Sequence, residues 1–218
     1  MHALYRRMRY IGGGHNHGDA GMTDTIDYYL AVQSPYAYLG SRAFEAIVKK
    51  SGAHVNVYPI DLFYIFPKTG GVPVAKRAPV RQAYRLTELR RWSAYRDMKL
   101  VLKPTHFPVD SALASRMIIA AERAGSDSLA LAHAFLAVTW AEDGDVSDPD
   151  TLARTANRLD MDGPVLRAAA EADVVGQIYE TYTNEALERG VFGSPTYYVG
   201  DQMFWGQDRL DFVERALA

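Results

Sequence analysis

The sequence predicts an α/β fold whose middle is occupied by an all-helical insertion. Short runs rich in aromatic and β-branched residues occur at 26–32 and 54–58, and two more follow near the end of the chain. Between these two groups, apolar residues recur at helical spacing over 80–189. A helical pattern at 36–50 separates the first two strands, so a right-handed crossover makes them parallel neighbours.

Each element has signals at its ends. Ser34-Pro35 suits a helix start after the first strand, and Gly52 marks that helix's end. Asp148-Pro149 is a second N-cap followed by proline, and Gly200-Asp201 is a hairpin turn. Strands are therefore expected at 26–32, 54–58, 196–199 and 203–205, and helices at 36–50, 80–98, 111–124, 128–142, 151–159, 164–171, 174–189 and 208–217.

Two segments are expected to lack regular structure. Residues 1–22 contain basic residues and a run of three glycines but no continuous apolar segment, so they are expected to be a disordered tail rather than a secretory signal. Met22 is a possible alternative start. Residues 61–79 carry three prolines and two glycines and are expected to form a long, functional loop, whereas the helix after it should bury a stripe that includes Tyr84, Leu89 and Tyr95.

Composition narrows the possible functions. The 218 residues are 48% hydrophobic, which is enough for a sizeable core. The net charge is −2, so no overall field favours nucleic acid or an anionic membrane, and no apolar run is long enough to span a bilayer. The chain has no cysteine, which excludes a disulfide framework, a thiolate metal site and a cysteine nucleophile. No metal site is predicted, and a cytoplasmic location is expected.

Three short motifs carry the candidate chemistry. Ser34-Pro35 stands at a strand-to-helix junction, where backbone N–H groups and the helix dipole favour an anion such as a thiolate. Ser194-Pro195 opens a strand, and a cis bond there would expose the backbone of Ser194 to a peptide-like ligand. Asp208 and Arg209 together would suit an amino-acid head group. Local sequence alone favours simpler interpretations: an N-cap, an edge-strand proline and an exposed ion pair.

Taken in order and spacing, the motifs resemble a known family. The chain resembles the 2-hydroxychromene-2-carboxylate isomerases and the related kappa-class glutathione transferases from about residue 26 to residue 217. The matching segments are Ser34-Pro35-Tyr36, Tyr58-Pro59, Gly70-Gly71-Val72-Pro73, Arg91-Trp92, Phe192-Gly193-Ser194-Pro195-Thr196 and Trp205-Gly206-Gln207-Asp208-Arg209. The resemblance implies a thioredoxin-like fold of the DsbA/kappa type, with the thioredoxin-like domain at 23–75 and 185–218 and the inserted helical domain at 76–184.

The resemblance also implies a glutathione site. Ser34 would hydrogen-bond the glutathione sulfur, and the backbone of Ser194 before a cis Pro195 would pair with the cysteinyl part. The γ-glutamyl end would lie against Trp205, Gly206, Gln207, Asp208 and Arg209. A small aromatic carboxylate would be the substrate, walled by Tyr36 and Tyr84, with Arg81 or Lys76 meeting its carboxylate. Arg81 departs from the lysine that family members tend to have at this position. The resemblance also suggests a homodimer.

The implied reaction is a cis/trans isomerisation of an aromatic keto acid through reversible addition of the glutathione thiolate. A kappa-like transferase acting on electrophiles is the main alternative, because Ser34 would serve both reactions. The absence of cysteine argues against a thiol-disulfide oxidoreductase. A thioredoxin-fold binding module without catalysis remains the non-enzymatic alternative.

Overall fold

The computed structural model describes residues 25–218, so the tail predicted for 1–22 lies outside the described residues. A four-stranded sheet has the order β2-β1-β3-β4. Strand β1 (Thr25–Leu30) pairs in parallel with β2 (His54–Pro59) and antiparallel with β3 (Thr196–Val199), which pairs antiparallel with β4 (Gln202–Trp205). The expected crossover and hairpin are both confirmed.

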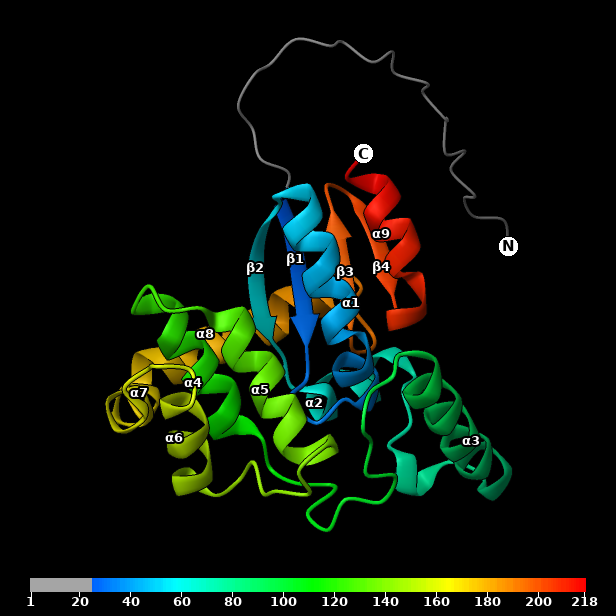
Figure 1. The fold of residues 1–218 in the computed structure, drawn as a ribbon, viewed down its shortest axis with the longest axis horizontal. Coiled ribbons are helices and arrows are strands. Elements are labelled where there is room, and N and C mark those ends of the chain that lie inside the picture. The colour runs from blue at the N-terminus through cyan, green and yellow to red at the C-terminus, as the bar shows by residue number, and fades with distance from the viewer. Residues whose placement is uncertain (1–24) are drawn as a thin grey trace, which may run out of the picture.

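Helices cover both faces of the sheet because β1 buries side chains on both sides. Tyr28 points into a cluster that α1 (Pro35–Ser51) and α9 (Leu210–Ala216) complete. Tyr29 points to the opposite face, against α2 (Leu62–Thr69) and α8 (Asp173–Glu188). Figure 1 shows α1 and α9 in front of the sheet, with α8 behind it.

The inserted helices continue the core of the sheet. They are α3 (Pro79–Tyr95), α4 (Ala112–Arg123), α5 (Ser128–Trp140), α6 (Pro149–Asn157) and α7 (Gly163–Ala170). One apolar cluster joins Tyr28 and Phe44 to Phe135 and Trp140 of α5, all of them buried. This cluster includes residues from both the thioredoxin-like and the inserted parts, so it does not separate them. The domain limits at 75/76 and 184/185 therefore stay predictions.

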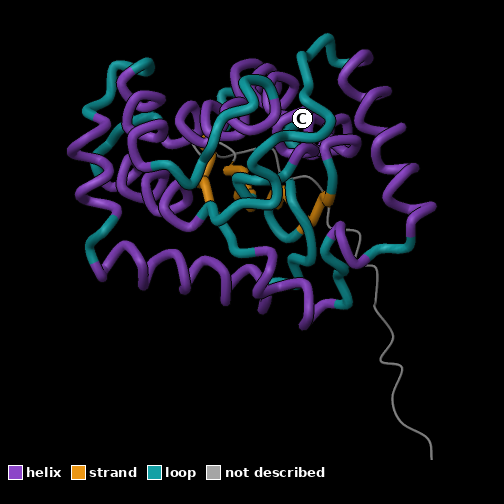
Figure 2. The backbone as a smooth tube through the Cα atoms, turned by 90° about the horizontal axis from the view of Figure 1, so that it is seen from below, coloured by secondary structure: helices purple, strands orange, loops and turns teal. Residues whose placement is uncertain are grey.

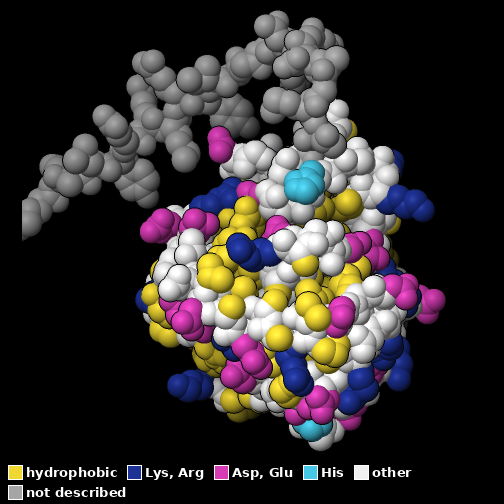
Figure 3. Space-filling model, turned by 90° about the vertical axis from the view of Figure 1, so that its left-hand side faces the viewer, with side chains coloured by type: hydrophobic (Ala, Val, Ile, Leu, Met, Phe, Trp, Pro, Cys, Tyr) yellow, Lys and Arg dark blue, Asp and Glu magenta, His cyan; other side chains and the backbone are white. Residues whose placement is uncertain are grey.

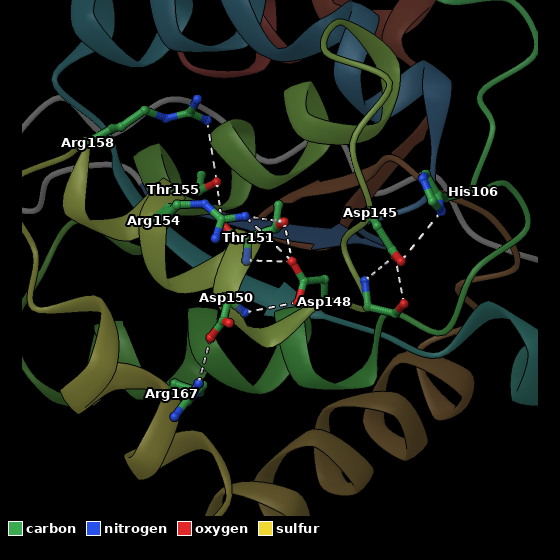
Figure 4. A network of polar contacts seen from close by, with 10 residues as sticks. His106, Asp145, Asp148, Asp150, Thr151, Arg154, Thr155, Arg158 and Arg167 are labelled. Carbon is green, nitrogen blue, oxygen red and sulfur yellow. Dashed lines mark hydrogen bonds and ion pairs between the residues drawn. The ribbon is translucent and has the colours of Figure 1, made fainter.

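The start of α6 follows the sequence signal. Asp148 caps the helix by accepting hydrogen bonds from the amides of Asp150 at 3.3 Å and Thr151 at 2.9 Å. Arg167 of α7 pairs with Asp150 at 3.2 Å, so the capped turn also connects the two helices (Figure 4). The prediction of a helix N-terminus at Asp148-Pro149 is confirmed.

Two sequence-based expectations are wrong. Residues 61–79 are not a continuous loop, because they contain α2 and a 3₁₀ turn at Val74–Lys76. The Asp61 carboxylate accepts from the Phe63 and Tyr64 amides, and Pro67 removes only one backbone hydrogen bond from this short helix. The apolar stripe predicted for α3 is not buried either. Leu89 is its one buried residue, while Tyr84 and Tyr95 are 60% and 76% exposed.

The surface carries mixed charge. Figure 3 shows basic and acidic side chains interspersed with hydrophobic ones on the face beside α7 and α8, without a continuous patch of one sign. Within residues 25–218, no helix combines the length and apolar character that a bilayer crossing requires.

Candidate active site

Ser34 caps α1 at the carboxyl end of β1. Its Oγ accepts a hydrogen bond from the Ala37 amide at 3.2 Å, and Pro35 occupies the first helical position. The side chain is buried, with 7% exposure. Figure 2 looks onto this end of the sheet and shows loops crossing it inside a ring of helices. The positive end of the α1 dipole therefore points into the loop-covered end of the sheet.

Two hydrogen bonds connect Ser194 to the segment that ends β1 and begins α1. The Ser34 hydroxyl donates to the backbone carbonyl of Ser194 at 2.9 Å. The Ser194 hydroxyl accepts from the Ala31 amide at 2.8 Å. The Ser194-Pro195 bond is cis, as the family resemblance implied and unlike the edge-strand proline that local sequence alone favoured. The first two candidate motifs thus lie in direct contact.

The third motif begins beside the second. A Cβ on Gly193 would lie 2.2 Å from the Trp205 indole nitrogen, so only glycine allows the indole this close. The ring of Trp205 also meets Phe192 edge-on, with centroids 4.7 Å apart. The Gly206 amide donates to the Pro195 carbonyl at 2.9 Å. Trp205 and Gly206 are therefore held against the cis-proline turn.

Asp208 and Arg209 pair with each other. The Arg209 guanidinium lies 3.0 Å from the Asp208 carboxylate, and both side chains are about half exposed. Asp208 also lines a groove of about 560 Å³ between α1, α3 and α9. The predicted role of the pair in holding an amino-acid head group stays a prediction, and this ion pair is the contact such a ligand would replace.

Gln207, which the resemblance places among the glutathione-binding residues, turns inward. It is 1% exposed, and its Oε1 accepts from Nη2 of Arg96 at 3.0 Å and from Nε at 3.2 Å. Its carbonyl accepts from the same Nη2 at 3.1 Å. Sequence reasoning missed Arg96. Gly40 inside α1, where a Cβ would lie 2.7 Å from the Gln207 Cβ, is a signal for the close approach of Gln207 but not for Arg96.

The residues predicted to bind substrate do not all lie in one site. Tyr36 is half-buried in the first turn of α1; burial raises the pKa of its phenol, and the positive charge of Arg85 opposes that rise. Arg81 and Tyr84 are exposed on α3. Arg85, one turn further along the same helix, was not predicted, because its spacing does not distinguish it from the other arginines of α3.

A cavity of about 330 Å³ opens beside Gln33, the residue before Ser34. Pro108, which follows a second cis bond, lines it together with Asp61, Asp110 and Tyr179. Burial raises the pKa of the Tyr179 phenol. Both carboxylates accept hydrogen bonds from backbone amides, Asp61 from Phe63 at 2.8 Å and Asp110 from Ala112 at 2.9 Å. Within residues 25–218, no group of three or more metal-ligating side chains gathers here or elsewhere.

Comparison with known proteins identifies the group of proteins that shares this architecture. The family model described as a DSBA-like thioredoxin domain matches residues 25–218. The 2-hydroxychromene-2-carboxylate isomerase of Pseudomonas putida is 30% identical over 197 residues, covering 88% of this chain and 93% of that protein. The enzyme of the same name from Sphingobium xenophagum is 29% identical over 201 residues, covering 90% and 99%.

A solved structure of a 2-hydroxychromene-2-carboxylate isomerase superposes with a TM-score of 0.76 at 26% identity, covering 88% of this chain and 94% of that one. This similarity confirms the predicted DsbA-like thioredoxin fold with a helical insertion between its strands. The chain therefore belongs to the DSBA-like thioredoxin domain family and, within it, to the group of the 2-hydroxychromene-2-carboxylate isomerases.

Proposed function

We propose that this protein is a glutathione-dependent isomerase acting on 2-hydroxychromene-2-carboxylate or a close analogue. The observation that carries the proposal is the contact between Ser34 and Ser194, which joins the α1 N-terminus to the turn before a cis proline. The relatives named above are isomerases of this kind. The chain has no cysteine of its own, so a thiol reaction here requires a thiol from a ligand.

The residues present fit a bound glutathione. The peptide group of Ser194 would pair with the cysteinyl part, in the manner of a short strand. Gly193 has no side chain because Trp205 occupies that space, and this holds the indole of Trp205 against the turn. Asp208 would meet the γ-glutamyl ammonium, and Arg209 would meet its carboxylate.

When bound, glutathione would supply a thiolate that adds reversibly to the conjugated double bond of the substrate. The role of Ser34 follows from its contacts. Its hydroxyl donates to a carbonyl, which cannot remove the proton, so Ser34 lacks a general base that would make it a nucleophile. The same O–H can instead rotate toward a sulfur anion. Ser34 and the α1 dipole would then stabilise the thiolate form together.

The substrate would lie beside the sulfur, between the cavity next to Gln33 and the half-buried ring of Tyr36. Pro108 and Tyr179 give that cavity flat walls suited to an aromatic ring. A cytoplasmic location agrees with this proposal, because glutathione is kept reduced there.

The direct test is product analysis with 2-hydroxychromene-2-carboxylate, with and without glutathione. We expect isomerised product only when glutathione is present, with no net consumption of the thiol. A rate no higher than that of the protein-free buffer would overturn the proposal. Accumulation of a glutathione conjugate without isomerised product would identify a transferase instead.

A further inference from the structure

Arg85 is a half-buried arginine on α3 whose charge lies against aromatic rings. Its guanidinium carbon is 5.6 Å from the ring centroid of Phe107 and 5.8 Å from that of Trp140. These two rings contact each other, with centroids 5.1 Å apart. Its partial burial lowers the pKa of Arg85.

The hydrogen-bonding capacity of this guanidinium is not used by the protein. Within residues 25–218, it makes no hydrogen bond and no ion pair, although arginine carries five N–H donors. Arg96 and Arg189 differ, since Arg96 donates to Gln207 and Arg189 pairs with Asp27 at 2.6 Å. Arg116 of α4 is another half-buried arginine, and its buried Nε has no partner within the described residues. An unpaired, partly desolvated cation is costly, so a site that keeps one is suited to an anion from outside the chain.

The charges around Tyr36 single out Arg85. Besides Arg85, the charges of Arg77, Glu88 and Asp208 also influence the pKa of the Tyr36 phenol. Each of these three is already engaged: Arg77 donates to the Val72 carbonyl at 2.7 Å, Glu88 pairs with Arg91 at 2.5 Å, and Asp208 pairs with Arg209 at 3.0 Å. Of these four charged groups, Arg85 is the one for which the described part of the chain provides neither a hydrogen bond nor an ion pair.

The position also connects this cation to the candidate active site. Tyr36 lies two residues after Ser34, and α3 stands beside the N-terminal end of α1 (Figure 1). On the other side, Phe107 precedes Pro108, which lines the cavity next to Gln33. Arg85 therefore lies between Tyr36, near Ser34, and Phe107, which adjoins the cavity-lining Pro108.

We propose that Arg85 binds the carboxylate of an aromatic substrate, with the Tyr36 hydroxyl as a second donor, and thereby selects anionic over neutral ligands. The fork of the guanidinium matches a carboxylate in two parallel hydrogen bonds. Arg85 takes this role in place of Arg81, whose side chain is exposed. The identity of the substrate rests on the proposed function, whereas the anion site itself is testable without turnover.

The test compares the binding of cinnamate with that of neutral cinnamamide by calorimetry on the full chain. We expect wild-type protein to bind cinnamate about 10- to 100-fold more tightly, the range for a charge-assisted hydrogen-bonding pair. Arg85→Gln should abolish this preference, and Arg85→Lys should retain part of it. Arg81→Gln tests the competing position. Arg90→Gln removes an exposed charge from the same helix and serves as the control.

Equal affinities in the wild type, a preference retained by Arg85→Gln, or a preference lost in Arg81→Gln instead would each overturn the proposal. Circular dichroism checks that the variants fold. If Arg85→Gln does not fold, Arg85→Lys decides, because an undiminished preference in that variant contradicts a two-pronged contact. A wild type that discriminates between the ligands but does not isomerise would refute the proposed function and leave the anion site standing.

Discussion

Ser34 donates its hydroxyl proton to the carbonyl of Ser194, a residue 160 positions later in the chain, at 2.9 Å. A hydroxyl has one proton, so this bond and a bond to a bound sulfur exclude each other. The Ser194 carbonyl can accept from a peptide ligand in place of Ser34. Ligand binding at Ser194 would therefore free the hydroxyl of Ser34 to turn toward the thiolate.

The first prediction concerns Ser34, which caps α1 and whose hydroxyl would donate a hydrogen bond to the glutathione sulfur. Ser34→Ala removes both the helix cap and the donor, whereas Ser34→Asp keeps a cap but places a negative charge beside the sulfur. Both variants should raise the pKa of bound glutathione, by about one to two pH units for the lost charge-assisted bond in the alanine variant. Thiolate absorbance against pH measures this. A titration unchanged in both variants would refute the role of Ser34.

The second prediction concerns Gly193. A Cβ there would clash with the Trp205 indole nitrogen, so Gly193→Ala should displace that ring and weaken glutathione binding by about tenfold or more. The matched control is Gly176→Ala on α8, where nothing lies within 4 Å of an added Cβ. That change should leave binding intact and stabilise the protein by about 1 kcal/mol. Calorimetry with glutathione and urea unfolding distinguish the two outcomes.

A third prediction follows from the hydrogen bonds between Arg96 and Gln207. Arg96→Leu leaves the buried Gln207 without its partner, which should destabilise the protein by about 1–3 kcal/mol. Because Asp208 and Arg209 follow directly, the affinity for glutathione should fall as well. Arg90→Leu, at an exposed position of α3, controls for the loss of charge. Glutathione affinity unchanged in Arg96→Leu would show that Arg96 supports the fold without positioning this turn.

A fourth prediction concerns acid stability. The hydrogen bond from His133 lowers the pKa of Glu45, and their Nδ1 and Oε1 atoms are 2.5 Å apart, joining α1 to α5. A carboxyl whose pKa is lowered on folding stabilises the protein above its unfolded-state pKa, and this stabilisation is lost as the pH falls through the folded-state value. Glu45 is half exposed, so solvent screening keeps the effect small.

Urea unfolding of Glu45→Gln against wild type, from pH 7 down to pH 3, measures this contribution. The variant should be less stable near neutral pH, and the difference should shrink below about pH 4.5 as the wild-type carboxyl becomes protonated. Glu171→Gln, an exposed position at the end of α7, provides the control. A stability difference that is constant across the pH range would contradict the assignment to this pair.

The sequence predicted features that depend on neighbouring residues. Ser34-Pro35 and Asp148-Pro149 start helices through capping and a fixed proline φ, both of which are local effects. The prolines and glycines of 61–79 predict a loop, but α2 forms there because Asp61 caps its start and Pro67 lies only in its last turn. In α3, the spacing of tyrosines suggested a buried face, but spacing does not show whether a partner element exists.

The residues of the candidate site also differ in whether local sequence or tertiary contacts identify them. Ser34, Ser194 and Trp205 occur in short motifs, and the fold brings these motifs together. Arg85 and Arg96 owe their distinction to residues far away in the chain, Phe107 and Gln207. Their own neighbours in sequence include several other arginines, so only tertiary structure identifies them.

The weak attachment of α3 has a consequence for the evolution of specificity. This helix contributes only Leu89 to the buried residues, while α4 and α5 share one apolar cluster with the sheet. Substitutions on α3 can therefore accumulate without opening the core, whereas changes on α5 are constrained by packing. Since α3 also carries Arg85, the helix most tolerant of sequence change is the one that would determine which anion the protein accepts.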